Sequence, residues 1–432
     1  MELKKNMAQR GIREYDAKSM LAKYWKEYIS TDFTYSGKLA LVDPDTNMDK
    51  LASKHAWLKK EKLVVKPDQL FGKRGKHGLI LLNADFAQAK KWIKERMNKE
   101  TKVGKVEGEL THFLIEPFSP HKNEYYIAIK GNREGDIIYF SNHGGVDIES
   151  VWDTVAEIKV SVEEDINKID VEKQLPKDTP KENKKIIADF IKGLYKFYDN
   201  LGYTYLEINP FAVEHNEIIP LDLVARLDDT AHFEHITQWG DLKFPAPFGR
   251  KLSKEEVYVK ELDAKTGASL KLTVLNPKGR VWTMVAGGGA SVIYADTIVD
   301  LGFKDELANY GEYSGNPNTE STYQYAKTIL ELMTKEKASK GQAKFLIVGG
   351  GIANFTDVAK TFTGITMALR EYKKKLIDTK VKIYVRRGGP NYQEGLKIMK
   401  NLGQELNIPI DVYGPETHMT RVVPMALKGG DA

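Results

Sequence analysis

A glycine-rich segment from Gly349 to Asp357 has the composition of a loop that binds an anion. It reads G-G-G-I-A-N-F-T-D, follows an apolar run at Phe345–Val348, and precedes an amphipathic helical pattern. Glycines let the backbone approach a ligand closely, and the first N–H groups of a helix point at that ligand with the positive end of the helix dipole. The segment therefore predicts a strand, a turn and a helix that together bind a small polyanion.

Two arginines, Arg386 and Arg387, end a later predicted strand and precede a second glycine turn at Gly388–Asn391. A guanidinium binds a carboxylate through two parallel hydrogen bonds, a geometry that lysine cannot provide. Arg387 is therefore a candidate ligand of a carboxylate, and a structural ion pair is its alternative role. For Asn354 and Thr356 in the first loop, the alternative to ligand binding is capping of the following helix.

A basic glycine-rich loop, Gly72–Gly78, lies between two predicted strands nearer the N-terminus. The first of these strands ends with Lys66, and the loop contains Arg74 and Gly75. Lysine neutralises a phosphate as a point charge, and backbone N–H groups wrap around it. The loop matches neither a Walker motif nor a dinucleotide fingerprint. A flap over a polyphosphate is one interpretation, and a solvated basic hairpin is the other.

A predicted hairpin brings two oxygen donors together. Strand alternation places Glu207 and Asn209 on one face. A two-residue turn at His215–Asn216 would set Asn209 opposite Asp222, with Cβ atoms roughly 4.5–5.5 Å apart if Pro210 does not disturb the register. Amide and carboxylate oxygens suit Mg²⁺, which shares its remaining positions with phosphates and water. A polar pair on an edge strand is the alternative.

Two patterns of secondary structure must position these residues. The first part of the chain mixes strand patterns with helical patterns at Phe86–Met97 and Lys184–Asn200, which is typical of an α+β fold. Beyond about residue 260, strands and helices alternate, which predicts a parallel, doubly wound α/β sheet with ligands outside the carboxyl ends of its strands. The segment Trp239–Lys251 breaks the periodicity with prolines and glycines. We therefore predict domains at residues 1–250 and 251–432.

Composition excludes several classes of protein. The chain of 432 residues has no cysteine, which excludes disulfides and thiolate chemistry. A net charge of +5 is a weak argument for nucleic-acid binding, and no apolar run approaches the ~20 residues of a membrane span. The charged stretch Met1–Arg13 lacks the apolar core of a signal peptide. We expect a cytoplasmic protein that binds neither nucleic acid nor membrane, and whether Met1 or Met7 is the native start stays open.

Taken together, these motifs resemble the amino-terminal, β-type portion of the ATP-citrate lyase family and the related large subunit of citryl-CoA synthetase. The β subunit of succinyl-CoA synthetase is a more distant resemblance. The similarity runs from about Arg13 to about Leu427. Its most specific strings are V-V-K-P-D-Q-L, L-I-E-P-F, L-E-I-N-P, D-A-K-T-G-A-S-L-K-L-T, M-V-A-G-G-G-A-S-V, N-Y-G-E-Y-S-G, I-A-N-F-T and V-R-R-G-G-P-N-Y-Q-E-G-L.

The resemblance implies an ATP-grasp domain followed by a flavodoxin-like, CoA-ligase-type domain. It implies phosphate binding by Lys66, Arg74 and Gly75, a hinge against adenine at Glu116, Pro117 and Ser119, a ribose contact at Glu124, and Mg²⁺ binding by Asn209 and Asp222. In the second domain, the implied citrate ligands are Gly351, Ala353, Asn354, Phe355, Thr356, Arg387 and, as a weaker correspondence, Tyr372.

The resemblance also implies that the chain is one half of an enzyme. Members of the family use a phosphorylated histidine on an α-type portion, whose glycine-rich segment is not found in this sequence. ATP would phosphorylate that histidine in a hetero-oligomer, with Glu207 orienting the imidazole as a carboxylate does elsewhere. The phosphoryl group would then pass to citrate, and CoA, held mainly by the partner, would attack citryl phosphate. The products would be citryl-CoA and then acetyl-CoA and oxaloacetate.

Three other functions stay open at this point. A citryl-CoA synthetase large subunit would stop at citryl-CoA, and only the length of the partner would distinguish it. A succinyl-CoA synthetase β subunit is disfavoured by the strings I-A-N-F-T and R-R-G-G-P-N. A nucleotide sensor or assembly scaffold without catalysis is disfavoured by Lys66, Asn209, Asp222 and Arg387.

Overall fold

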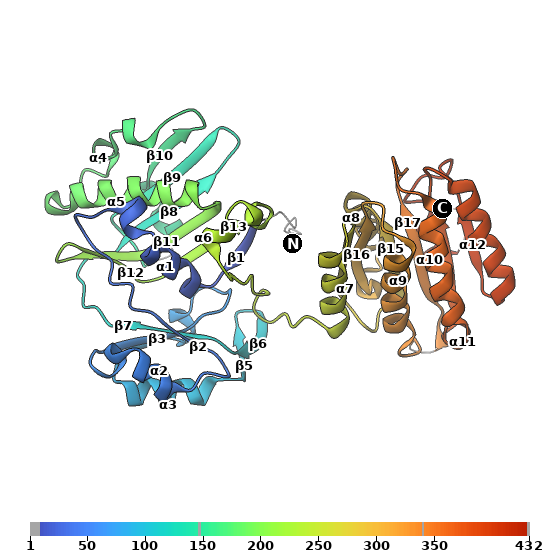
Figure 1. The fold of residues 1–432 in the computed structure, drawn as a ribbon, viewed down its shortest axis with the longest axis horizontal. Helices are drawn as coiled ribbons and strands as arrows, with labels where there is room; N and C mark the ends of the chain where they lie inside the picture. Colours follow the sequence, from blue (N-terminus) through green and yellow to red (C-terminus); the bar gives the residue numbers. More distant parts are fainter. Residues whose placement is uncertain (1–8, 146–147, 339–340, 430–432) are drawn as a thin grey trace. The chain divides into compact units, whose positions relative to one another are not determined.

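The computed structural model describes residues 9–145, 148–338 and 341–429. The chain divides into two compact units, residues 1–251 and 252–432 (Figure 1). Each unit has a hydrophobic core of its own. The two candidate start residues, Met1 and Met7, lie outside the described residues. Within the described ranges, no helix is both long and apolar enough to cross a membrane.

The described strands of the first unit form two larger antiparallel sheets and one hairpin. The larger sheet has the order β1 (Gln9–Ile12), β13 (Leu223–Asp228), β11 (Tyr203–Glu214), β8 (Tyr125–Gly131), β9 (Gly135–Ser141) and β10 (Ala156–Ser161), with β12 (Glu217–Pro220) paired to β11. The smaller sheet has the order β2 (Ala40–Val42), β7 (Phe113–Pro117), β3 (Leu63–Pro67) and β4 (Leu81–Ala84). The hairpin joins β5 (Lys99–Val103) and β6 (Val106–Leu110).

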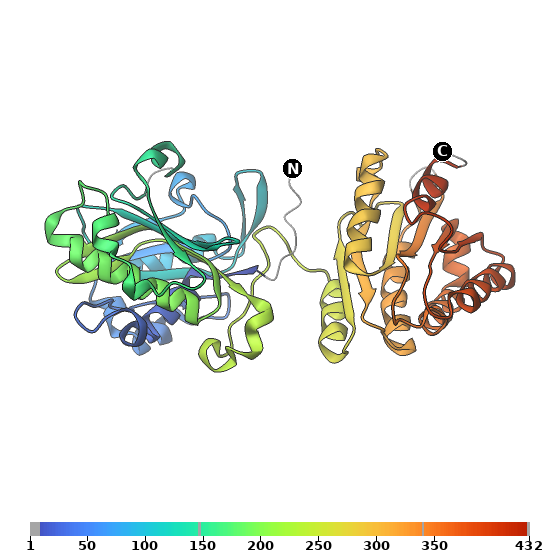
Figure 2. The same cartoon turned by 90° about the horizontal axis from the view of Figure 1, so that it is seen from above.

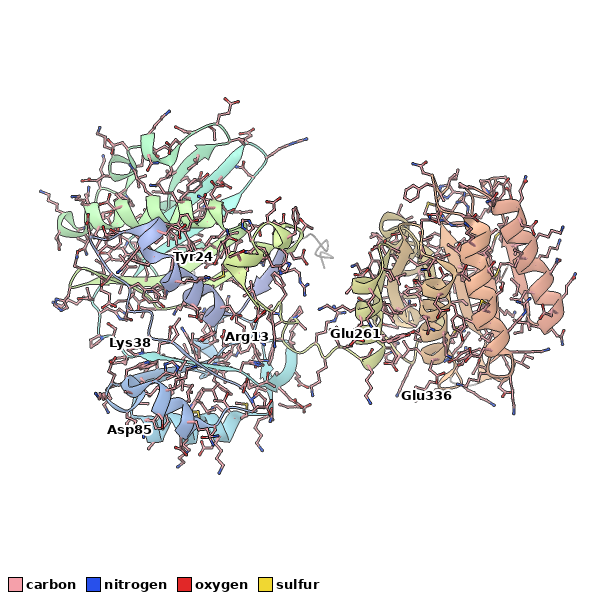
Figure 3. All side chains as sticks on the ribbon, in the orientation of Figure 1. Arg13, Tyr24, Lys38, Asp85, Glu261 and Glu336 are labelled. Atoms are coloured by element: carbon pink, nitrogen blue, oxygen red, sulfur yellow. The ribbon has the colours of Figure 1, made fainter. Side chains whose placement is uncertain are left out.

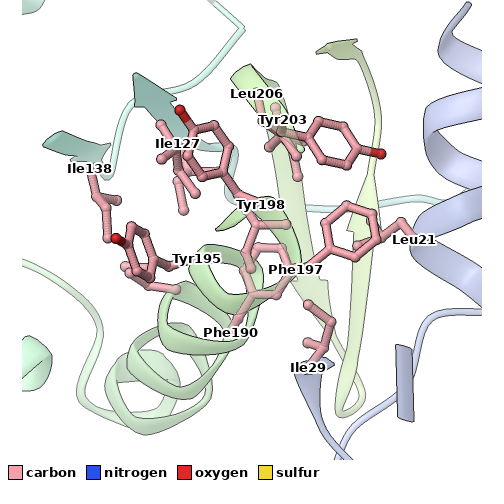
Figure 4. Close-up of a cluster of buried hydrophobic side chains, with 14 of the residues drawn as sticks. Leu21, Ile29, Ile127, Ile138, Phe190, Tyr195, Phe197, Tyr198, Tyr203 and Leu206 are labelled. Atoms are coloured by element: carbon pink, nitrogen blue, oxygen red, sulfur yellow. The ribbon is translucent and has the colours of Figure 1, made fainter. Parts of the chain in front are cut away.

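Amphipathic helices cover these sheets. Helices α1 (Glu14–Lys23) and α5 (Lys181–Asn200) contribute buried residues to the core of the larger sheet, and α2 (Met48–Lys54) and α3 (Phe86–Arg96) pack on the smaller one. Short helices complete the unit at α4 (Val171–Gln174) and α6 (Ile236–Trp239). Figure 4 shows the apolar face of α5, with Phe190 and Tyr198, directed at Ile127 and Leu206 of the sheet. The predicted helices at Phe86–Met97 and Lys184–Asn200 are confirmed.

The hairpin formed by β11 and its returning strands has the predicted register. Both turn residues have positive φ, 46° at His215 and 62° at Asn216, as a two-residue hairpin turn requires. The pairing keeps one register on both sides of Pro210. The N–H group of Asn209 donates to the carbonyl oxygen of Asp222 at 2.9 Å. Asn209 and Asp222 therefore lie opposite each other, and this prediction is confirmed.

The second unit contains a parallel sheet with the order β15 (Val281–Ala286), β17 (Lys344–Gly350), β18 (Val381–Arg386) and β19 (Ile410–Tyr413). An antiparallel pair, β14 (Ser269–Val274) and β16 (Asn309–Ser314), adjoins it. The side chain of Asn309 links β16 to β15 because it bonds both the N–H and the carbonyl oxygen of Thr283, at 2.8 and 2.9 Å.

Helices cover both faces of this parallel sheet (Figure 2). Trp282 and Met284 of β15 face a core shared with α9 (Thr319–Thr334), α10 (Val358–Glu371) and α12 (Tyr392–Leu406). Val281 and Val285 of the same strand face α8 (Gly288–Asp300) and α13 (Val422–Lys428). Helices α7 (Lys254–Lys265) and α11 (Lys373–Asp378) complete the unit. The alternation of strands and helices therefore gives the predicted doubly wound sheet.

Candidate functional site

The first unit contains a cavity of about 770 Å³, lined by strands of both antiparallel sheets. Pockets for small molecules have volumes of about 300–1,000 Å³, so a nucleotide fits. The structure brings together here every residue predicted for ATP, for the metal and for orienting a histidine. These residues are Lys66, Arg74, Gly75, Glu116, Pro117, Ser119, Glu124, Glu207, Asn209 and Asp222.

A cluster of buried ions adjoins this cavity. Charged side chains such as Asp85, Glu261 and Glu336 generally extend outward from the ribbon (Figure 3), so buried ones are exceptional. The Nζ atom of Lys66 lies 2.7 Å from the carboxylate of Glu14 and 2.9 Å from that of Glu116. It also donates to the carbonyl oxygen of Leu221.

Arg74 belongs to the same cluster. Its Nη2 atom lies 2.7 Å from the carboxylate of Glu14 and also pairs with Asp222. Its Nη1 atom donates to the carbonyl oxygen of Pro67 at 2.9 Å, which ties the basic loop to the end of β3. The Nε atom of Arg74 is buried and has no hydrogen-bond partner in the described part of the chain. The guanidinium therefore retains one unused donor.

Burial and charge act against each other in this cluster. Burial alone disfavours the ionised carboxyl of Glu14, but Lys18, Lys66 and Arg74 hold its pKa well below the usual range. Burial also disfavours the charged guanidinium of Arg74, but Glu14, Asp222 and Asp68 raise its pKa. Burial, with Glu14 nearby, raises the pKa of Asp68 to about 7. Glu14 and Arg74 therefore both stay ionised at neutral pH.

The hairpin positions the remaining polar residues of the cavity. Asn209 accepts a hydrogen bond from the N–H group of Gly145 at 2.8 Å through its side-chain oxygen. Glu207 accepts a hydrogen bond from the hydroxyl of Tyr205, two residues earlier on the same face of β11. The guanidinium of Arg226 lies 5.6 Å from the centre of the Tyr205 ring. The orientation of Glu207 is therefore fixed by a neighbour that the sequence analysis did not identify.

Sequence reasoning also missed Glu14, Lys18 and Asp68. Glu14 and Lys18 are opposite charges four residues apart on the apolar face of α1, between buried residues such as Ala17 and Leu21. A charged pair at that spacing is ordinarily a surface feature of a helix. The position of Glu14 and Lys18 on the apolar face of the helix was the signal in the sequence that could have indicated a buried ion pair.

In the second unit, Arg387 follows β18 at the carboxyl edge of the parallel sheet. It is only 4% exposed, and its Nη1 atom donates to the carbonyl oxygen of Gly351 at 2.8 Å. Its Nε atom has no hydrogen-bond partner, and no carboxylate forms an ion pair with it among the residues that the structure describes. Burial lowers the pKa of Arg387. The structural ion pair that was its alternative role is therefore absent from the described part of the unit.

Arg386, the preceding residue, has a different environment. Its guanidinium donates to the carbonyl oxygens of Gly350, Pro415 and Thr417 at 2.9, 3.2 and 2.8 Å. Arg386 therefore joins the turn after β17 to the segment after β19. Its donors are used within the fold, whereas Arg387 keeps a donor that is not used.

The loop after β17 lies against the glycine turn that follows Arg387. The N–H group of Ala353 donates to the carbonyl oxygen of Gly388 at 3.0 Å. A side chain at Gly350 would not fit, because its Cβ would lie 2.6 Å from Nη1 of Arg387. The glycines thus allow the loop, the second turn and the guanidinium to meet.

The helix cap in this loop differs from the predicted one. Asp357, rather than Asn354, caps α10, and its side chain accepts from the N–H group of Lys360 at 3.1 Å. In the described part of the chain, the side chains of Asn354 and Thr356 form no hydrogen bond. Phe355 is 70% exposed. The capping role proposed as an alternative for Asn354 and Thr356 is therefore wrong, and both polar side chains are free for a ligand.

Tyr372 is the one predicted citrate residue that the structure does not bring to this loop. It caps the C-terminus of α10, a helix of 14 residues that spans about 20 Å. Its hydroxyl donates to Glu331 at 2.5 Å. Tyr372 and the loop thus lie at opposite ends of one helix. His418, in the segment after β19, is exposed, and its Nδ1 atom bonds the hydroxyl of Thr420 at 2.9 Å.

Comparisons with known proteins give consistent results for both units. Residues 8–239 match the family model described as the ATP-citrate synthase ATP-grasp domain, and residues 250–429 match the model described as ATP citrate lyase citrate-binding. The chain is 49% identical to ATP-citrate synthase alpha chain protein 2 of Oryza sativa subsp. japonica, covering 98% of this chain and 99% of that one.

Two further relatives show how much of other proteins the chain covers. It is 52% identical to ATP-citrate synthase of Bos taurus over 98% of its own length, but it spans only 38% of that protein. A solved structure of ATP citrate lyase from Methanothrix soehngenii, in complex with citrate and coenzyme A, superposes with a TM-score of 0.89 at 57% identity. That match covers 97% of this chain and 100% of the other.

Proposed function

The chain belongs to the ATP-citrate synthase family, and we propose on this premise that it binds ATP and citrate for the synthesis of citryl-CoA. The predicted fold class is confirmed, because an ATP-grasp domain precedes a doubly wound parallel sheet. Membership of this family also excludes a succinyl-CoA synthetase β subunit.

The observation that carries the citrate assignment is the environment of Arg387. A buried guanidinium without a carboxylate partner is costly, and a bound carboxylate would offset that cost. Its Nε atom has no hydrogen-bond partner among the described residues, and the loop that it contacts at Gly351 also contains Asn354 and Thr356, whose side chains form no hydrogen bond there. Gly351, Ala353 and Phe355 belong to the same loop. This set of donors suits a small acid with several carboxylates.

The cavity of the first unit suits a nucleotide. Lys66, Arg74 and Gly75 would contact its phosphates, and Glu116, Pro117, Ser119 and Glu124 would contact adenine and ribose. The opposed oxygens of Asn209 and Asp222 fit Mg²⁺, which takes one or two protein ligands and completes its shell with phosphate and water. The ion would neutralise charge on the phosphates.

The chemistry requires an imidazole from a partner. Because the chain spans 38% of the bovine relative, the proposal assigns the phosphorylated histidine to an α-type partner subunit or segment. Glu207, oriented by Tyr205, would accept a hydrogen bond from that imidazole and hold it toward the nucleotide. Arg387 and its loop would then orient a citrate carboxylate for phosphorylation. Phosphorylation turns a carboxylate oxygen into a leaving group, so that the thiol of CoA can form the thioester.

The reaction beyond citryl-CoA depends on the partner. Cleavage to acetyl-CoA and oxaloacetate would require an additional module there, whereas a citryl-CoA synthetase would lack it. Reconstitution with the co-purified partner distinguishes the two, because only the first releases oxaloacetate. A sensor without catalysis would bind ATP and leave the partner's histidine unphosphorylated.

Citrate binding by the purified chain tests the second site. Arg387→Ala should weaken citrate binding by roughly 10- to 100-fold, as expected for the loss of a charge-assisted hydrogen bond, and should leave Mg·ATP affinity unchanged. Calorimetric titration measures both constants. Arg370→Ala is the matched control, since Arg370 forms an exposed pair with Glu405. Equal citrate affinity in all three proteins would remove Arg387 from the site.

Phosphorylation of the partner tests the first site. Asp222→Asn should abolish magnesium-dependent phosphorylation of the histidine in the reconstituted complex, because a neutral amide binds Mg²⁺ far less well than a carboxylate. Radiolabelled ATP measures the transfer. A normal rate in this variant would show that Asp222 does not hold the metal.

A further inference from the structure

Glu14 is a buried carboxylate that contacts three cations. Its side chain lies 2.8 Å from Nζ of Lys18, 2.7 Å from Nζ of Lys66 and 2.7 Å from Nη2 of Arg74. Glu14 is 4% exposed and Lys18 is fully buried. Asp68 fixes the backbone beneath Glu14, because its carboxylate accepts the N–H groups of Glu14 and Tyr15 at 2.8 and 3.1 Å. The start of α1 is thus attached to the chain segment that follows Lys66.

Glu14 lies behind the cavity rather than in its wall. Lys66, Arg74, Glu116 and Asp222 all line the cavity, whereas neither Glu14 nor Lys18 does. A ligand in the cavity would therefore meet the cations and not Glu14 itself. The carboxylate holds the charged ends of Lys66 and Arg74 on the side away from the cavity that both residues line.

Stability alone does not account for this arrangement. Buried ion pairs are often replaced by apolar side chains without loss of stability, so α1 could pack on the sheet without them. Lysine and arginine side chains have several rotatable bonds, and a carboxylate shared between the two fixes their charged ends at one separation. Fixed charges matter most for phosphoryl transfer, which depends on positioning and charge neutralisation.

We propose that Glu14 is a positioning residue, which holds Lys66 and Arg74 in the arrangement that phosphoryl transfer from ATP requires. The inference rests on the proposed function of the cavity. Glu14 repels the phosphates at the same time as it orders the cations. Its removal is therefore expected to change Mg·ATP affinity little and to lower the rate of transfer.

The test is a double variant that keeps the charge balance. Three cations, Lys18, Lys66 and Arg74, face three carboxylates, Glu14, Glu116 and Asp222. Glu14→Gln combined with Lys18→Met leaves two of each and preserves side-chain volume. A purely structural role predicts that the double variant recovers both stability and activity relative to Glu14→Gln. The positioning role predicts recovered stability with a kcat lowered on the order of 100-fold.

Three measurements distinguish the outcomes. Calorimetry gives the Mg·ATP dissociation constant of the chain, thermal unfolding gives its stability, and the reconstituted complex gives kcat for histidine phosphorylation. If Glu14 is a positioning residue, the double variant should bind Mg·ATP with a dissociation constant within about threefold of wild type and should still show the lowered kcat. A kcat close to wild type, or a loss confined to affinity, would overturn it. If the double variant does not unfold cooperatively, Glu14→Asp replaces it and should lower kcat because its shorter side chain cannot reach all three cations.

The wild-type complex separates this inference from the proposed function. If the wild-type chain binds Mg·ATP and phosphorylates its partner, and the double variant does so equally fast, only the role of Glu14 is refuted. A wild-type chain that binds no Mg·ATP overturns the proposed function, and the role of Glu14 falls with it.

Discussion

Two buried arginines, Arg74 in the first unit and Arg387 in the second, have similar exposure but opposite surroundings. Each is 4% exposed, and each has an Nε atom without a hydrogen-bond partner among the described residues. Arg74 pairs with the carboxylates of Glu14 and Asp222, whereas Arg387, within the described part of the chain, bonds only the carbonyl oxygen of Gly351. The pKa of Arg74 is accordingly raised and that of Arg387 is lowered.

This difference suggests how each of the two proposed sites would select its ligand. In the first unit the positive charges are already balanced by carboxylates. Under the proposed function, an entering anion would therefore bring a cation that binds the carboxylate of Asp222 in place of Arg74. Mg·ATP satisfies that condition. In the second unit the charge of Arg387 has no counter-ion within the described residues, so the proposed site would bind an anion without a metal. Citrate satisfies that condition.

The largest expected effect is on stability and contrasts the two arginines directly. Arg74→Met should destabilise the first unit by about 3 kcal/mol, because it removes one partner from a buried ionic cluster. Arg387→Met should leave the second unit equally stable or more stable, because no carboxylate among the residues that the structure describes loses its partner. Urea unfolding of both variants measures the difference. Equal destabilisation by the two substitutions would contradict the difference drawn between the surroundings of Arg74 and Arg387.

A smaller effect is expected from pH and is confined to the first unit. The pKa of Asp68 is about 7 in the fold, with Glu14, Arg74 and Asp16 as the charged neighbours, against about 3.9 in the unfolded chain. The proton stabilises the folded state below pH 4, and this stabilisation is lost as the pH rises through about 7. Relative to Asp68→Asn, wild-type unfolding free energy should fall by about 1 kcal/mol between pH 6 and 7.

Urea unfolding of both proteins across that range measures the pH effect. The second unit serves as an internal control, because its unfolding should show no difference between wild type and Asp68→Asn at any pH. A difference between the two proteins that stays constant with pH would show that Asp68 is ionised throughout.

The smallest effect is expected from sulfate, an anion that brings no divalent cation. At about three times its dissociation constant, sulfate should stabilise the second unit by about 0.8 kcal/mol. The gain should disappear in Arg387→Met and persist in Arg74→Met. Thermal unfolding with sulfate and with chloride at equal ionic strength measures it. Equal stabilisation of the first unit would show that its carboxylates do not exclude bare anions.

The sequence predicted the parts of the sites that depend on local pattern. Alternation and the His215–Asn216 turn determine which residues of the hairpin share a face, so the opposition of Asn209 and Asp222 could be predicted. The parallel sheet followed from its regular strand and helix spacing, and parallel strands bring Gly351 and Arg387 to one edge. The roles of these residues in binding stay predictions that the proposed experiments test.

Other features depend on tertiary packing, which local pattern does not report. Glu14 and Lys18 look like an ordinary surface pair of a helix until α1 is packed on the sheet. Both Asn354 and Asp357 have side chains that cap helices, and only the backbone path of the loop selects Asp357. Tyr372 is separated from the loop by the full length of α10, a distance that motif similarity does not express.

Arg386 and Arg387 have consequences for mutational scanning of this chain. Loss of Arg386 removes donors to three carbonyl oxygens from two separate segments, so its variants should accumulate poorly in cells. Under the proposed function, loss of Arg387 should leave protein abundance intact and abolish growth under selection for the reaction with citrate. Substitutions at both positions would therefore impair growth in a growth screen. In an expression screen, only those at Arg386 would lower the amount of protein.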